Sequence, residues 1–226
     1  QKVAVARAVA RQPKIILFDE PITNVDVGSK IQLKRALKRL VKQHNQTIIY
    51  VTHDQTEAMT LADEILLMLE GAIVQRGTPR DLYNHPNDRF GGFFLGNPGI
   101  NFVDVALERT GSGPAVARPL FAQAVPITGV DGHNEIVVDI RPERIRVYAQ
   151  PRPHAVEAML VRSALVVGGQ RLLTIRIGDA VLKTKAADEH EYREGERIYV
   201  ECPIEHVILF DRDGHRLGAV AATVRA

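Results

Sequence analysis

The first hundred residues alternate between the spacing of amphipathic helices and short apolar runs. One helical pattern fills "QKVAVARAVARQP" and stops before Pro13, and a second covers residues 28–43. The continuous runs "KIILFD" and "TIIYVT" are typical of strands buried in a parallel sheet. A short helix over residues 54–63 and a hairpin over residues 64–77 follow. The order strand, helix, strand predicts a βαβ unit and an α/β fold.

The pattern changes at the break "GNPG", after which long helical patterns nearly vanish. Short β-like runs separated by turn signals take their place, over residues 135–141, 144–149, 156–169, 171–178, 180–186, 197–203 and 206–211. Short strands at regular spacing predict a small barrel or sandwich. We therefore expect two domains, an α/β domain over residues 1–99 and an all-β domain over residues 100–226.

Composition places the chain in the ordinary globular class. It has 226 residues, of which 45% are hydrophobic and 25% charged. The net charge of +2 is nearly balanced, so charge alone implies no nucleic-acid partner. The single cysteine, Cys202, excludes an intrachain disulfide and is interpreted as a small buried hydrophobe. No apolar run approaches the roughly 20 residues that span a bilayer, so any membrane role is expected to be peripheral.

Polar residues follow both apolar runs of the first domain at the point where each strand is expected to end. Asp19 and Glu20 follow the first run, and His53 follows the second. Because ligands bind beyond the carboxyl ends of strands in open α/β sheets, one acid can hold a cation such as Mg²⁺ while the other faces a reacting water. His53 can donate a hydrogen bond to an anion there. The alternative is two ordinary acids and a histidine in turns.

These stretches resemble the ATP-binding subunits of ABC transporters, of the sugar-importer type related to the maltose and glycerol-3-phosphate systems. "QKVAVARAVARQPKIILFDEP" matches the Walker B region, "TNVD" the D-loop and "VTHDQTEAMTLAD" the switch-histidine segment. "GAIVQRGTPRDLYNHPNDRF", "DIRPERIRV" and "ECPIEHVILFD" extend the resemblance over essentially the whole chain. It implies the C-terminal part of a P-loop ABC ATPase domain, followed by an OB-like accessory barrel of the TOBE type.

The resemblance also implies a role for each polar residue. Asp19 would coordinate Mg²⁺, and Glu20 would polarise the attacking water as general base. Asp26 would reach the phosphate loop of a second subunit, and His53 would contact the γ-phosphate of ATP. The implied cofactors are ATP and Mg²⁺. The implied partners are a second ATPase subunit, membrane permease subunits and, indirectly, a solute-binding protein. No nucleic acid is implied, and the expected location is cytoplasmic, on the inner face of the cell membrane.

The printed sequence contains no P-loop of the form G-x-x-x-x-G-K-[ST]. The family's Q-loop and LSGGQ signature would also precede Gln1. We therefore expect the chain to be the C-terminal portion of such a subunit, unable to bind ATP tightly or hydrolyse it alone.

Two other functions stay open at this stage. The β-barrel half would serve as a regulatory or ligand-binding module, or the chain would come from an ABC ATPase without a permease, as in repair or translation. "NPGINFV" resembles the entry to the importers' C-terminal domain and argues against the second of these. The transported solute cannot be deduced, and sugars, glycerol phosphate and polyamines are all compatible.

Overall fold

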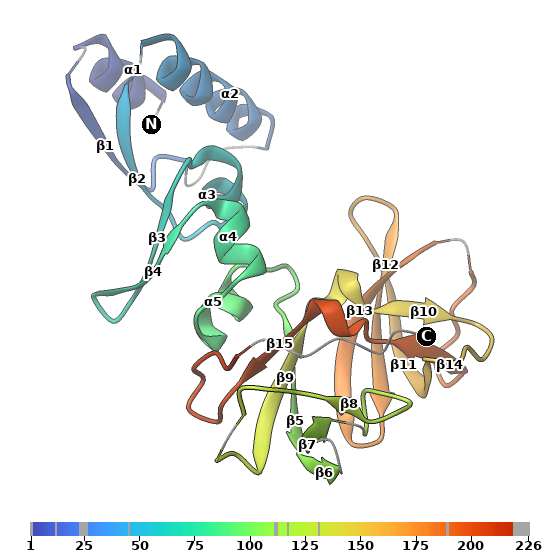
Figure 1. Cartoon of the computed structure of the whole chain (residues 1–226). Helices are drawn as coiled ribbons and strands as arrows, with labels where there is room; N and C mark the ends of the chain where they lie inside the picture. The colour runs from blue at the N-terminus through green and yellow to red at the C-terminus, as the bar shows by residue number, and fades with distance from the viewer. Residues whose placement is uncertain are drawn as a thin grey trace. The chain divides into compact units, whose positions relative to one another are not determined.

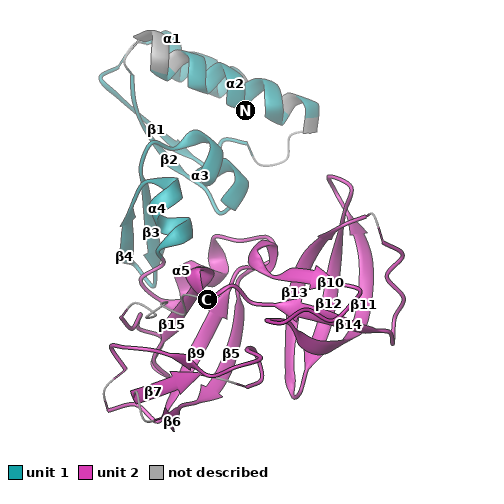
Figure 2. Ribbon diagram, turned by 45° about the vertical axis from the view of Figure 1, so that its right-hand side comes forward, with its two compact units in different colours: residues 1–85 teal, residues 86–226 magenta. Residues whose placement is uncertain are grey.

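The structure is a computed structural model that describes residues 2–11, 13–22, 27–44, 46–110, 113–116, 118–130, 132–188 and 190–218. The chain divides into two compact units, residues 1–85 and residues 86–226 (Figure 2). The two units are the parts of the chain within which residues make most of their contacts. The domain boundary predicted near residue 100 remains a prediction.

Unit 1 alternates helices and strands in the predicted order (Figure 1). Its elements are α1 (Lys2–Ala10), β1 (Ile15–Asp19), α2 (Val27–His44), β2 (Thr47–Val51), α3 (Gln55–Leu61), β3 (Ile65–Leu69), β4 (Ala72–Gly77) and α4 (Pro79–Asn84). Strands β1 and β2 pair in parallel, and β3 pairs with β4 antiparallel. The α/β prediction for this part of the chain is confirmed.

The β1–β2 sheet is covered on one face. A hydrophobic cluster of unit 1 combines residues of α1, β1, the turn after β1 and α2, namely Val5, Ile16, Phe18, Ile22 and Leu37. Ile48 and Tyr50 of β2 are partly buried and pack against it. Ile15 and Leu17 point the other way and are 57% and 67% exposed. The expectation of a strand buried on both faces is therefore met on one face only. In the part of the chain that the structure describes, helices pack on just that face.

Local sequence features explain the turn between β3 and β4 and the start of α4. Glu70 and Gly71 have φ values of 49° and 82°, as the two central residues of a type I′ hairpin turn require. Helix α4 was not predicted, although its start is encoded. Thr78 accepts a hydrogen bond from the Asp81 backbone N–H, and Pro79 occupies the first helical turn.

Unit 2 consists mainly of antiparallel strands, as predicted. It contains α5 (Arg89–Phe94), β5 (Asn101–Ala106), β6 (Glu108–Thr110), β7 (Gly113–Val116), β8 (Val125–Pro126), β9 (Glu135–Ile140), η1 (Pro142–Arg144), β10 (Arg146–Tyr148), β11 (Val156–Val166), β12 (Gln170–Ile177), β13 (Ala180–Ala187), β14 (Arg197–Glu201), η2 (Ile204–His206) and β15 (Val207–Phe210). The sheet orders are β10-β14-β11-β12-β13, β15-β9-β5 and β6-β7-β8. Strands β5 to β8 and helix α5 were not predicted.

One large apolar cluster fills unit 2, with Leu160, Leu173 and Ile175 wholly buried within it. Cys202 belongs to this cluster and is 4% exposed, which confirms its interpretation as a buried hydrophobe. Burial raises the pKa of its thiol to about 12, so the thiolate that reacts with electrophiles is suppressed.

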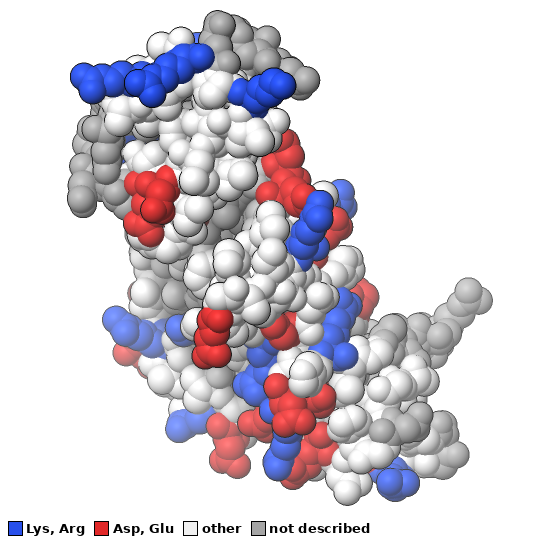
Figure 3. Space-filling view, turned by 90° about the vertical axis from the view of Figure 1, so that its left-hand side faces the viewer, with Lys and Arg blue, Asp and Glu red and all other residues white. Residues whose placement is uncertain are grey.

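The surface agrees with the balanced composition. Lysine and arginine side chains and aspartate and glutamate side chains both occur on the face that Figure 3 shows. None of the described helices is both long and apolar enough to cross a membrane.

Candidate functional site

The candidate site lies at the carboxyl ends of β1 and β2. The parallel register places Asp19, the last residue of β1, opposite Val51, the last residue of β2. The backbone N–H of Glu20 donates to the Val51 carbonyl at 2.9 Å, so the pairing continues one residue beyond β1. Residues that follow the two strands therefore emerge side by side, as parallel pairing requires.

Glu20 and His53 meet at this edge. Nδ1 of His53 lies 2.7 Å from Oε1 of Glu20, within hydrogen-bond distance. An ionised carboxylate only accepts hydrogen bonds, so Nδ1 carries the proton in this contact. The Glu20 backbone has φ 43°, in the left-handed region that residues other than glycine rarely adopt. Such strain costs about 1–3 kcal/mol and persists where the surrounding structure enforces it.

The contact changes the proton affinity of the imidazole. The hydrogen bond to Glu20 and the charge of Glu20 raise the pKa of His53 above its usual value of 6.5. The side chain of His53 is 72% exposed, so both the ring and its partner remain accessible to a ligand. A protonated ring with Nδ1 bound to Glu20 retains Nε2–H as a second donor, the group that an anionic phosphate would accept from.

Asp19 is exposed at the same edge. Among the described residues, no three His, Cys, Asp or Glu side chains gather into a complete metal site. Mg²⁺ is commonly held by one or two carboxylates together with phosphate oxygens and waters. The accessible Asp19 carboxylate can supply one such ligand. Asp26 lies outside the described residues, and its predicted role remains a prediction.

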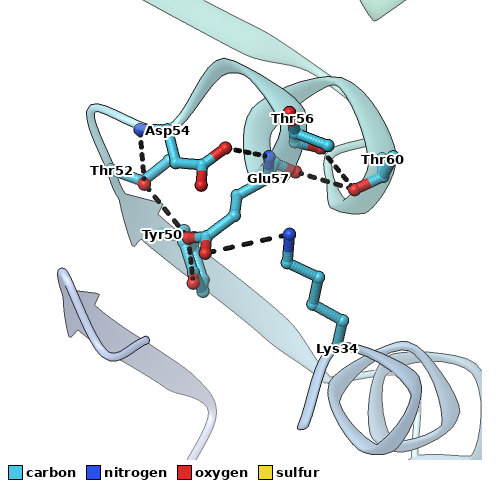
Figure 4. Close-up of polar contacts among 7 residues, drawn as sticks. All are labelled: Lys34, Tyr50, Thr52, Asp54, Thr56, Glu57 and Thr60. Atoms are coloured by element: carbon cyan, nitrogen blue, oxygen red, sulfur yellow. Dashed lines mark hydrogen bonds and ion pairs between the residues drawn. The ribbon is translucent and has the colours of Figure 1, made fainter. Parts of the chain in front are cut away.

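A buried polar cluster next to the site was not predicted. Glu57 of α3 is 3% exposed, and its carboxylate accepts hydrogen bonds from Tyr50 and Thr52 (Figure 4). Burial and the Glu57 hydrogen bond raise the pKa of Tyr50. The available signal was the spacing of Asp54 and Glu57, which matches a capping box. Asp54 does cap the helix, but the Glu57 side chain turns to β2 instead.

Unit 2 contains a hollow of about 610 Å³ between β10, β13 and residues 190–192. Its polar lining is mainly basic and aromatic: Arg146, Tyr148, Arg152, Lys185, His190 and Tyr192, together with Gln150. The Arg152 guanidinium lies 5.5 Å from the centre of the Tyr148 ring, while Arg146 forms an ion pair with Glu201 at 3.1 Å. Such a lining suits a small anionic ligand with a face that can stack.

Comparison with known proteins gives related sequences over nearly the whole chain. The chain is 36% identical over 221 residues to the sn-glycerol-3-phosphate import ATP-binding protein UgpC of Chromohalobacter salexigens, covering 96% of this chain and 58% of that protein. It is 36% identical over 222 residues to the sulfoquinovosyl glycerol transport ATP-binding protein SmoE of Agrobacterium fabrum, covering 96% and 60%. With the trehalose/maltose import ATP-binding protein MalK of Thermococcus litoralis, identity is 32% over 222 residues, covering 94% and 59%.

The chain thus spans somewhat over half the length of these relatives. Residues 138–210, within unit 2, match the TOBE domain. The predicted resemblance is confirmed: the chain is a homologue of the ATP-binding subunits of ABC importers for sugars and glycerol phosphate, and it carries a TOBE domain.

Proposed function

We propose that this chain forms part of the ATP-hydrolysing subunit that powers an ABC importer of sugars or related small solutes. The observation that carries the proposal is the Glu20–His53 contact at the ends of two parallel strands. A carboxylate and a histidine at this position suit phosphoryl transfer, which needs positioning and charge neutralisation more than covalent chemistry.

Each site residue receives a proposed role. Glu20 orients and deprotonates the attacking water as general base. His53, held by Glu20 through Nδ1, offers Nε2–H to the γ-phosphate of ATP. Asp19 would hold Mg²⁺, which would supply charge neutralisation at the phosphate. Asp26 reaches the second ATPase subunit of a homodimer.

The proposed setting is the cytoplasmic face of a membrane, where the homodimer binds permease subunits that receive solute from a binding protein.

The exposed apolar residues of β1 support the idea of a larger nucleotide-binding domain. Ile15 and Leu17 lie on a face that parallel sheets normally cover with a further layer. We propose that further elements of the complete subunit cover it.

The test compares this chain alone with a joined subunit, a polypeptide that links it to a relative's preceding segment carrying the G-x-x-x-x-G-K-[ST] loop. We expect Mg²⁺-dependent ATP hydrolysis by the joined subunit and none by the chain alone, because the phosphate cradle and its lysine are absent from the 226 residues. Release of inorganic phosphate measures both. Hydrolysis by the isolated chain that Glu20→Gln abolishes would contradict this proposal.

A second candidate function, ligand binding by unit 2, is favoured by the basic and aromatic hollow. Here the expected ligand is a small phosphorylated sugar, with Arg152 and Tyr192 as contacts. Isothermal titration of the chain with glucose 6-phosphate should show binding that Arg152→Ala weakens at least about tenfold, the loss of one charge-assisted hydrogen bond. Arg162→Ala, an exposed change elsewhere in unit 2, is the matched control. Equal affinity in both variants would exclude the hollow as the site.

A further inference from the structure

Glu57 is a buried acid close to, but outside, the Glu20–His53 contact. Glutamate is almost never fully buried without partners, yet this side chain is 3% exposed. Neither the predicted catalytic roles nor the fold alone explains why a short, partly exposed helix should carry a carboxylate inward. The hydrogen bonds and the ion pair of Glu57 indicate its role.

Three elements converge on the Glu57 carboxylate (Figure 4). On Oε2, the Tyr50 hydroxyl donates a hydrogen bond from β2 at 2.8 Å, and the Thr52 hydroxyl donates one from the following turn at 3.1 Å. On Oε1, the Lys34 ammonium of α2 lies at 3.8 Å. Hydrogen bonds to an ionised acceptor are stronger than neutral ones, so this acid fastens α2, β2 and α3 together.

The same contacts hold the residues on either side of His53. Thr52, which precedes it, donates to Glu57 and accepts from the Asp54 backbone N–H at 3.0 Å. Asp54, which follows it, accepts from the Glu57 backbone N–H at 3.0 Å. Both neighbours of His53 are therefore tied to Glu57, one through its side chain and one through its backbone, while the histidine ring itself is left to contact Glu20.

We propose that Glu57 is a positioning residue for His53: it fixes the Thr52–Asp54 turn so that the imidazole reaches the Glu20 carboxylate. Lys34 extends this restraint to α2, so the histidine and that helix keep a fixed relation. This inference rests on the proposed function only where it links the His53–Glu20 contact to ATP hydrolysis. The contact itself and the hydrogen bonds around Glu57 are observed in unit 1.

Chemistry explains why a carboxylate is required. Two hydroxyls donate hydrogen bonds to Glu57 and an ammonium forms an ion pair with it, and an ionised carboxylate offers only acceptors and a negative charge. Glutamine would turn an NH₂ donor towards some of these donors. Aspartate would keep the charge but shorten the reach by one methylene, so it could not hold both hydroxyls from the same helix position.

The test measures the pKa of His53 by NMR titration of its ring in the full chain. Glu20→Ala, which removes the carboxylate that accepts from Nδ1, defines the decrease that follows loss of the contact. We expect Glu57→Asp and Thr52→Val each to produce at least half of that decrease, whereas Thr52→Ser, which keeps the hydroxyl, restores the wild-type value. Glu64→Gln, an exposed acid of unit 1 paired with Arg76, should leave the His53 pKa unchanged.

These variants separate positioning from charge. Glu57 also raises the pKa of His53 directly by its charge, but Glu57→Asp and Thr52→Val retain a negative group. An unchanged His53 pKa in both, in protein whose amide spectrum remains folded, would overturn the inference. If Glu57→Asp fails to fold, the Thr52→Val and Thr52→Ser pair decides. ATP hydrolysis by the joined subunit is a separate readout. If these variants lower the pKa of His53 but hydrolyse ATP at the parent rate, Glu57 still positions His53. The proposed role of His53 in ATP hydrolysis would then be wrong.

Discussion

Replacing Glu20 by glutamine should reduce the kcat of ATP hydrolysis in the joined subunit about 10²- to 10⁴-fold, the usual contribution of a general base. Glutamine keeps the size of the side chain and can still accept a hydrogen bond from His53, but it cannot take a proton from water. The fold should survive, because the Glu20 side chain is 43% exposed. Steady-state phosphate release measures the change.

Two controls give this result its meaning. Glu64→Gln removes an exposed carboxylate of the same unit and should leave kcat unchanged. Affinity for ATP, measured by equilibrium binding, should stay within a few-fold of the parent value, since the general base acts in the transition state. A Glu20→Gln subunit that hydrolyses ATP at nearly the parent rate would show that another group activates the water.

The second large effect concerns the buried acid Asp139 of β9. Its side chain is 0% exposed, and neither carboxyl oxygen has a hydrogen-bond partner among the described residues. Burial raises the pKa of Asp139 to about 9, although the charges of Arg89 and Arg141 act in the opposite direction. Asp104 adds a smaller upward contribution. The folded chain therefore holds this carboxyl group neutral at pH 7.

Because the folded-state pKa lies above the ordinary value of 3.8, the folded chain binds a proton that the unfolded chain has lost. The free energy of unfolding should then fall as pH rises between about 4 and 9, by up to about 1.4 kcal/mol per pH unit from this group. The contribution of protonated Asp139 to the free energy of unfolding is constant at pH values below 3.8 and is fully lost above about pH 9.

Urea unfolding of the chain at several pH values, followed by amide NMR signals of unit 2, measures this dependence. Asp139→Asn should flatten the pH dependence by close to one proton. Asp179→Asn, at an exposed turn of the same unit, should leave it unchanged. Parallel pH profiles for the parent and Asp139→Asn would mean that Asp139 is ionised in the folded chain.

The sequence predicted the parts of the site that follow from strand pairing. Asp19, Glu20 and His53 each end or follow a short apolar run, and parallel pairing brings them to one edge of the sheet as expected. The direct contact between Glu20 and His53 was not predicted. The resemblance supplied the family and the TOBE domain, both confirmed by the comparisons. The individual roles of these residues remain proposals.

What the sequence did not show depends on three-dimensional packing. Glu57 lies on a short helix whose pattern gives no sign that its acid turns inward to Tyr50. Asp139 interrupts an apolar strand in a position that alternation would place on the polar face, yet both faces of β9 are buried. Helix α5 was not predicted because it has only six residues, too few to show a helical repeat of apolar positions, and two of them are glycine, a poor helix former.

We propose that the edge formed by Asp19, Glu20 and His53 hydrolyses ATP to drive solute import. The most direct test reconstitutes the joined subunit with the permease and solute-binding protein of the same importer in lipid vesicles and measures ATP hydrolysis. We expect solute-loaded binding protein to accelerate hydrolysis and Glu20→Gln to abolish this acceleration. A folded assembly whose hydrolysis ignores solute, or persists with Glu20→Gln, would contradict it.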